Sequence, residues 1–346
     1  MKIRSKFAGK GALAVAVLAG GAVAATAFAP SPAMAQKKYF VKIGMATIND
    51  PQHIWGKWIG EEMKKRSGGR LTFQTFPASQ LGKIPRQVEG IQLGTQEMFL
   101  TPPGFFVGVN QAFMVPDAPG FFRDAIHAHK TLTDPAFRNK FLSMGENKGV
   151  IGNGISIYDG TSYATLKPMK NLADMKGRKI RVLATPMERA VPAQFGATGV
   201  PIPFTEVVPA LQRSVVDGAR TSLVVMAYTK FQTVTKFLTV VNDGYIPSAS
   251  WVSKVWLSKL PKDLQKIVLD VAGELEDKAS ENARNNVDAM VKVWKEAGAT
   301  VSKFSPEDQK TYMAKVRPLG DKFLGQHKNP QVREMYALMK QVAARH

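Results

Sequence analysis

The chain of 346 residues contains no cysteine. Disulfide bonds and a lipid anchor on cysteine are therefore excluded, and stability in an oxidising compartment must come from packing alone. Acidic residues are also scarce, because 27 aspartates and glutamates stand against 47 lysines and arginines, which gives a formal net charge of +20. The basic residues are dispersed, with no dense arm and no nucleic-acid motif, so we expect no nucleic-acid partner. The positive charge is compatible with two interpretations: a surface that concentrates anionic solutes, or one that is attracted to an anionic membrane.

Motifs for catalysis and for cofactors are missing as well. The sequence has no HExxH, GxSxG, P-loop or GxGxxG pattern, so the usual parts of hydrolytic, nucleotide and dinucleotide sites are absent. The five histidines are scattered, and His127 and His129 have the wrong spacing for one helical face, so we interpret the histidines as surface residues. We therefore expect no metal and no cofactor, and a binding protein and not an enzyme.

One long apolar run is present, at the N-terminus. Four basic residues precede the apolar residues 12–27, and the small-x-small sequence at 33–35 follows, directly before Gln36. This is the pattern of a secretory signal peptide, so we predict a cleaved leader at 1–35 and an exported mature chain. An uncleaved membrane anchor is the alternative. No later stretch has the apolar length that spans a bilayer.

The mature chain begins as alternating strands and helices. Hydrophobic periodicity predicts these elements, in chain order, at 40–45, 53–66, 71–76, 84–93 and 98–100. The first helix is expected to turn Ile54, Trp58 and Met63 towards a core. Two successive strand–helix units imply a parallel sheet and an α/β fold. Because about 310 residues exceed one comfortable core, we expect two lobes with a ligand cleft between them.

The segment 172–218 carries the clearest candidate binding site. Residues 179–183 alternate as a strand, and small or apolar residues from Val207 to Val215 fall on one helical face. Phe204 should then lie at the start of this helix, where ligands meet α/β sheets. We expect Arg181 and Phe204 to face one cleft and to form an anion site for a carboxylate. A structural salt bridge is the alternative role for Arg181.

The sequence also predicts both ends of that helix. Thr205 can cap its N-terminus, and Gly218 can end it just past Asp217.

Several motifs in this sequence resemble the DctP-type solute-binding proteins of TRAP transporters. They are GRL at 69–71, FPASQLG at 76–82, EGIQLGT at 89–95, DMKGRKIRV at 174–182, PIPFTEV at 201–207 and LQRSVVDG at 211–218. The resemblance runs from about Lys42 to about Lys266, and in that family the arginine that matches Arg181 grips the solute's carboxylate. It implies a periplasmic subunit that captures an organic carboxylate and delivers it to the membrane subunits of a TRAP permease. A solute sensor for a receptor kinase and, more remotely, an exported enzyme acting on a carboxylic acid are the alternatives.

The resemblance also implies a two-lobed periplasmic-binding-protein fold with a central sheet in each lobe. Hinge crossings are expected near Asp159 and Pro247, so lobe I would comprise 36–158 plus 248–286 and lobe II 159–247 plus 287–346. A long helix that runs along both lobes is expected in this fold, and helical periodicity continues from Leu260 to Gly298. Further helices are predicted after Ser305 and from about Pro330.

Three positions depart from the family pattern. Ser162 takes the place of a second arginine, Thr221 that of an asparagine which also touches the carboxylate, and Arg220 that of a glutamate. Thr221 can still donate a hydroxyl hydrogen bond. Arg220 either restores the missing positive charge in the cleft or points to solvent.

The loop after the third strand predicts the character of the solute. It reads Thr101-Pro-Pro-Gly-Phe105-Phe106, which forms an apolar wall. Burying hydroxyls there without partners costs about 1–3 kcal/mol each, which disfavours a heavily hydroxylated sugar acid. We expect a carboxylate with a compact apolar or aromatic body, such as a 2-oxo acid or an aromatic acid. The alternative is that Phe105 and Phe106 belong to the core.

Overall fold

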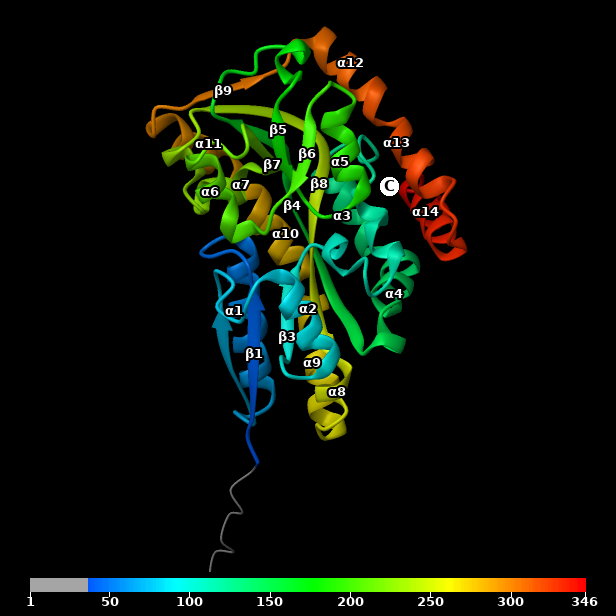
Figure 1. Cartoon of the computed structure of the whole chain (residues 1–346). Coiled ribbons are helices and arrows are strands. Elements are labelled where there is room, and N and C mark those ends of the chain that lie inside the picture. Colours follow the sequence, from blue (N-terminus) through cyan, green and yellow to red (C-terminus); the bar gives the residue numbers. More distant parts are fainter. Residues whose placement is uncertain (1–36) are drawn as a thin grey trace, which may run out of the picture. The chain divides into compact units, whose positions relative to one another are not determined.

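The strands form one mixed sheet of nine strands in residues 37–346, the part of the chain that this computed structural model describes (Figure 1). The strands are β1 (Tyr39–Met45), β2 (Leu71–Phe76), β3 (Met98–Thr101), β4 (Val150–Thr165), β5 (Lys179–Val182), β6 (Thr198–Pro201), β7 (Gly218–Ser222), β8 (Phe237–Ser253) and β9 (Thr300–Lys303). Their order is β2-β1-β3-β8-β4-β7-β5-β6, with β9 also paired to β8. The predicted leader at 1–35 lies outside the described residues and stays a prediction.

The two longest strands, β4 and β8, join two groups of shorter strands. They pair with each other in antiparallel fashion, and the other strands flank them as the β1 half (β1, β2 and β3) and the β5 half (β5, β6, β7 and β9). β1 is parallel to β2 and β3, and β5 is parallel to β6 and β7, so the predicted parallel pairing is confirmed. The sheets expected in the two lobes are therefore present as the two halves of one continuous sheet, which β4 and β8 join.

The expected crossings lie at an irregularity in this pair of strands. The register shifts between Ile157 and Gly160, and Ile157 lies opposite Pro247. That these two positions act as a hinge stays a prediction.

Helices cover the sheet and follow the predicted order. They are α1 (Pro51–Arg66), α2 (Ile84–Leu93), α3 (Ala125–Thr133), α4 (Pro135–Ser143), α5 (Pro186–Ala193), α6 (Phe204–Gln212), α7 (Leu223–Tyr228), α8 (Lys254–Leu257), α9 (Lys262–Glu274), α10 (Glu276–Asn285), α11 (Val287–Glu296), α12 (Pro306–Val316), α13 (Pro318–Gly320) and α14 (Pro330–Ala343). No helix between Lys37 and His346 combines the length and the apolar character needed to cross a membrane.

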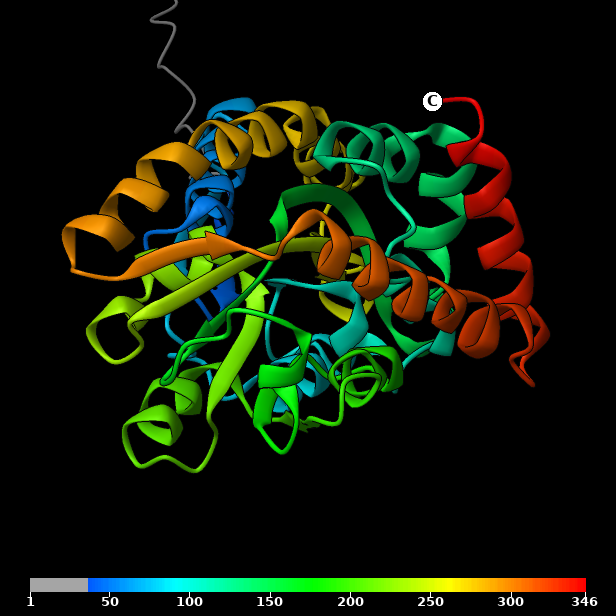
Figure 2. The same ribbon diagram turned by 90° about the horizontal axis from the view of Figure 1, so that it is seen from above.

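The long helix of the sequence analysis is three consecutive helices. α9, α10 and α11 are separated by the single residues Leu275 and Asn286, and Gly298 follows in a left-handed conformation with φ of 76°. α9 packs on α1 and β4, whereas α11 packs on α7 and β9, so the three segments extend along both halves of the sheet (Figures 1 and 2). The helix starts predicted at Ser305 and Pro330 are confirmed. α14 packs against α3 and α4.

The predicted buried face of α1 is wrong by one residue. Trp55, Ile59 and Met63 are fully buried, whereas Ile54 and Trp58 are only partly covered. Trp58 instead lies under the ammonium group of Lys278, which is 4.1 Å from the ring centroid. An aromatic residue can satisfy either environment, because its face attracts a cation and its area packs in a core.

The predicted capping residue and the predicted C-terminal end of α6 are also wrong. The N-cap is Pro203, Thr205 makes no capping bond, and Gly218 is the first residue of β7. The helix stops earlier because Ser214 adopts a left-handed φ of 55°, which lets the N–H of Val215 bond to the carbonyl of Ala210. A left-handed residue with this hydrogen bond ends the helix, and glycine usually occupies that position.

Asp159 fixes the crossing of β4 to the start of α7. Its carboxylate accepts hydrogen bonds from the Ser222 hydroxyl and from the N–H of Leu223 at 2.8 Å. Burial raises the pKa of Asp159 to about 6, although these hydrogen bonds oppose the shift. The folded protein therefore holds a proton on Asp159 between about pH 4 and pH 6, where the unfolded chain has released it.

We expect this proton to make stability fall as pH rises. The contribution of Asp159 is complete below about pH 4 and is lost through about pH 6, and a shift of about two pKa units corresponds to roughly 3 kcal/mol. Urea unfolding at pH 4 to 7 measures the free energy of unfolding of the wild type and of Asp159→Asn. From pH 4 to pH 7, this free energy should fall by roughly 3 kcal/mol more in the wild type than in the variant. The exposed Asp288→Asn is the matched control. If the free energy of unfolding depends on pH in the same way for the wild type and for Asp159→Asn, the raised pKa of Asp159 is refuted.

Candidate functional site

The carboxyl ends of four strands surround a small cavity of about 40 Å³. Polar side chains from both halves of the sheet line it: Thr47, Gln52, Thr101, Tyr158, Arg181 and Thr221. Thr47 follows β1 and Thr101 ends β3, whereas Arg181 and Thr221 lie in β5 and β7. Ligands of α/β proteins bind at such strand ends, so this cavity is the candidate site.

Arg181 is a buried cation that no acid of residues 37–346 neutralises. Its side chain is 1% exposed, its Nε donates to the carbonyl of Ile202 at 3.1 Å, and its guanidinium carbon lies 5.5 Å from the ring centre of Phe204. Within residues 37–346, no carboxylate lies within 4 Å of it and its two terminal amino groups have no hydrogen-bond partner. Burial lowers the pKa of Arg181 to about 10, with Glu188 opposing the shift. Burying an unpaired charge costs free energy, and an anion bound beside Arg181 would offset this cost.

Four of the six predicted ligand residues meet in the cavity. Arg181, Phe204, Thr221 and Phe105 all line it, and the ring of Phe204 lies at the start of α6 as expected. Phe105 and Phe106 have different roles. Phe105 is partly buried and forms part of the wall, whereas Phe106 is core and stacks on Trp251 with 4.5 Å between ring centres.

Ser162 and Arg220 do not line the cavity. Ser162 lies opposite Thr221 in the β4–β7 pair, and within the described chain its buried hydroxyl has no hydrogen-bond partner. Arg220 follows the alternation of β7, which turns it to the face opposite that of Thr221. At 1% exposure, Arg220 does not point to solvent either.

Arg220 is held by two buried acids. Nη1 is 2.6 Å from Oε1 of Glu188, and Nη2 is 2.8 Å from Oδ2 of Asp243. Burial alone would lower the pKa of Arg220, but the two carboxylates outweigh it and raise the pKa well above its usual value. Arg220 and Arg181 are thus equally buried, yet among the described residues two acids neutralise Arg220 and none neutralises Arg181.

The sequence analysis missed Thr47 and Gln52 of the β1 half and Tyr158 of β4. The amide Nε2 of Gln52 donates to Oγ1 of Thr47 at 3.2 Å, and the hydroxyl of Tyr158 donates to Asp50 at 2.8 Å. The rule about strand ends that pointed to the segment around Arg181 could have found Thr47, which comes two residues after β1. Tyr158 directly precedes the expected crossing, whereas no local pattern singles out Gln52.

The interpretation of all histidines as surface residues is wrong for two of them. His53 and His127 are each 5% exposed, and each accepts a backbone N–H, from Asn49 and Arg123 respectively. Each ring thus closes the turn before its own helix. No cluster of three or more potential metal ligands occurs in residues 37–346.

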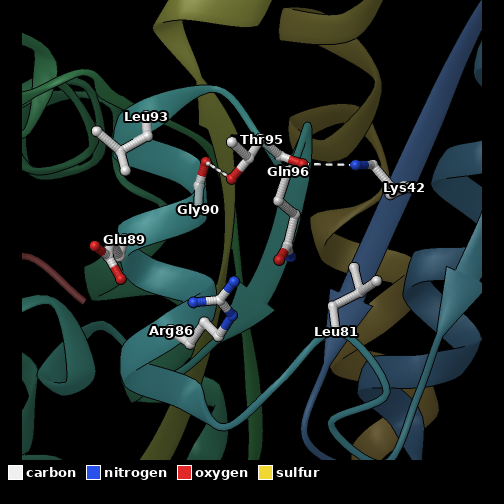
Figure 3. Close-up of a pocket in the computed structure, with 8 residues that line it drawn as sticks. All are labelled: Lys42, Leu81, Arg86, Glu89, Gly90, Leu93, Thr95 and Gln96. Atoms are coloured by element: carbon white, nitrogen blue, oxygen red, sulfur yellow. Dashed lines mark hydrogen bonds between the residues drawn. The ribbon is translucent and has the colours of Figure 1, made fainter.

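A second hollow, of about 280 Å³, lies between α2 and β1 (Figure 3). Its Lys42 is already engaged, with Nζ 2.6 Å from the carbonyl of Thr95 and 3.6 Å from Glu97. Arg86 and Glu89 are exposed there, where water screens their charges. None of the predicted ligand residues lines it, so the cavity at Arg181 is the better candidate.

Comparison with known proteins agrees with this fold. The model of the bacterial extracellular solute-binding proteins, family 7 (DctP), matches residues 44–326. A 2,3-diketo-L-gulonate-binding periplasmic protein of Escherichia coli is 30% identical over 280 residues, which are 80% of this chain and 83% of the relative. The C4-dicarboxylate-binding periplasmic protein DctP of Rhodobacter capsulatus is 29% identical, with 87% of this chain and 92% of the relative covered.

A solved structure shows the same two-lobed architecture. The TRAP periplasmic solute-binding protein of Desulfovibrio salexigens, with bound orotic acid, superposes with a TM-score of 0.83 at 26% identity, covering 89% of this chain and 99% of the other. Because the family model spans most of the sequence, the chain belongs to family 7 of the bacterial extracellular solute-binding proteins, the DctP family.

Proposed function

We propose that this protein captures an organic carboxylate by pairing it with Arg181 and delivers it to the membrane subunits of a TRAP permease. The observation that carries the proposal is the buried guanidinium of Arg181, whose terminal amino groups have no partner within the described residues. A carboxylate matches the planar fork of an arginine with two parallel hydrogen bonds. Relatives named for diketogulonate and C4-dicarboxylates, and the neighbour with bound orotic acid, support an organic acid. The family binds solutes, so the chain is a binding protein and not an enzyme.

The rest of the wall favours a compact apolar body. The apolar lining comprises Ile84, Pro102, Phe105, Phe204, Val225 and Ile246. Phe204 stacks on Phe231, which holds its ring in place beside Arg181. A cavity of about 150 Å³ admits benzene, whereas this one has about 40 Å³. An aromatic acid therefore requires the wall to move further than a short 2-oxo acid does.

Solute capture should close the two lobes around the site. The cavity takes residues from both 36–158 and 159–247, so a bound solute contacts both proposed lobes and favours the closed state. The lobe boundaries expected from the resemblance, with 248–286 in lobe I and 287–346 in lobe II, are part of this proposal. The protein would act in the periplasm after removal of its leader.

Native mass spectrometry of the mature protein from its host, followed by a thermal-shift panel, tests this function. We expect a carboxylate of one defined mass, and a rise in unfolding temperature with short oxo acids or apolar carboxylates. Ligand at 100 times its Kd stabilises the folded state by about 2.7 kcal/mol, which such a panel detects. Stabilisation by sugar acids alone would contradict the compact apolar body, and no response to any carboxylate would contradict the proposed function.

A further inference from the structure

The wall that the β1 half and Tyr158 contribute to the cavity carries no charge. Among the described residues that line it, Arg181 is the one charged side chain, and the facing polar residues are Thr47, Gln52, Thr101 and Tyr158. Tyr158 stays neutral, because burial raises the pKa of its hydroxyl well above its usual value. A second carboxylate on the solute would therefore find no cation in this wall.

A buried carboxylate lies directly behind the same wall. Asp50 accepts the hydroxyl of Tyr158 at 2.8 Å on one oxygen and the N–H of His53 at 3.0 Å on the other. Since Tyr158 directs its proton to Asp50, its oxygen can only accept further hydrogen bonds. The lone pairs of this oxygen, together with the acid behind it, oppose an anionic group on the solute.

Gln52 supplies an amide donor to this wall. Its carbonyl oxygen accepts the hydroxyl of Ser248 at 2.7 Å, and its amide nitrogen donates one hydrogen to Thr47 at 3.2 Å. An amide nitrogen carries two hydrogens, so one remains for a solute. This N–H beside the acceptor oxygen of Tyr158 complements a group that both accepts and donates, as a hydroxyl or a primary amide does.

We infer that the cavity selects carboxylates with a single negative charge and with one neutral hydroxyl or amide group at the end remote from Arg181, and that it rejects dicarboxylates. The inference rests on the proposed function, because Arg181 must receive the carboxylate. It specifies the net charge of the solute, and it identifies Gln52 as the residue that hydrogen-bonds to the second end of the solute.

Isosteric pairs test the inference with the mature protein. Succinate and succinamate, glutarate and glutaramate, and terephthalate and terephthalamate differ within each pair only by carboxylate against amide. Isothermal titration calorimetry should show the monoamide binding about tenfold or more tightly in at least one pair. Gln52→Leu should bring the affinity ratio of succinamate to butyrate close to one. A ratio within one variant does not depend on how much of that variant is folded.

Each other result has a distinct meaning. A dicarboxylate that binds as tightly as its monoamide overturns the inference and leaves the proposed function intact. Butyrate binding without binding of any monoamide overturns the selection by Gln52 while the pairing with Arg181 stands. Failure of every carboxylate overturns the proposed function itself.

Discussion

Replacing Arg181 with Met is expected to weaken carboxylate binding by about 30- to 5,000-fold and to leave the solute-free protein at least as stable as the wild type. The loss corresponds to roughly 2–5 kcal/mol, as for other buried charge pairs that lose one partner. Stability should not fall, because the substitution removes a buried charge that no acid neutralises and Met fills a similar volume. Calorimetric titration with the identified solute and urea unfolding without it measure the two effects.

A matched variant separates pairing from general charge. Arg213→Met removes one positive charge from an exposed position just after α6, so it should leave the affinity within about twofold of the wild type. If Arg181→Met binds the solute normally, the carboxylate pairing is refuted. If Arg181→Met instead unfolds more easily without solute, Arg181 serves the fold, which is the structural alternative considered from the sequence.

Replacing Arg220 with Met is expected to have the opposite effect. It leaves Glu188 and Asp243 buried without their counter-ion, and breaking a buried ion pair in this way costs about 3–5 kcal/mol. Affinity of the folded protein should change little, since Arg220 lies on the face of β7 opposite the cavity. Urea unfolding and calorimetry with correction for the folded fraction check both statements.

The double variant Arg220→Met/Glu188→Gln is the control for this mechanism. Removing one of the two acid charges should recover part of the lost stability, because less uncompensated charge stays buried. Unchanged stability in Arg220→Met, together with lost affinity, would show that Arg220 reaches the solute and that the ion pairs are secondary.

The order of the elements and the location of the site were largely predictable from the sequence. The strand near 179–183, the helix start at Phe204 and the parallel pairing follow from local periodicity and chain order. The separation of Thr221 from Arg220 was also within reach of the sequence. Once both are placed in one strand, adjacent side chains must point to opposite faces, so only one of them can line the cavity.

Other details depend on small differences that local patterns do not resolve. The face of α1 differs by one residue, because Trp55 and Trp58 have the same intrinsic preference and the packing of α9 and α10 decides which is covered. The early end of α6 rests on a left-handed Ser214, a position that sequence rules assign to glycine.

By itself, the sequence determined an α/β fold without disulfides and a short list of candidate ligand residues that included both Arg181 and Arg220. Only the tertiary structure decided that, within the part of the chain it describes, acids neutralise Arg220 and none neutralises Arg181. The partners of Arg220 are 32 and 23 residues away along the chain, on α5 and β8. The energy of a buried charge depends on the charges and dipoles within a few ångströms of it, and these neighbours are set by how the strands assemble and not by their order along the chain.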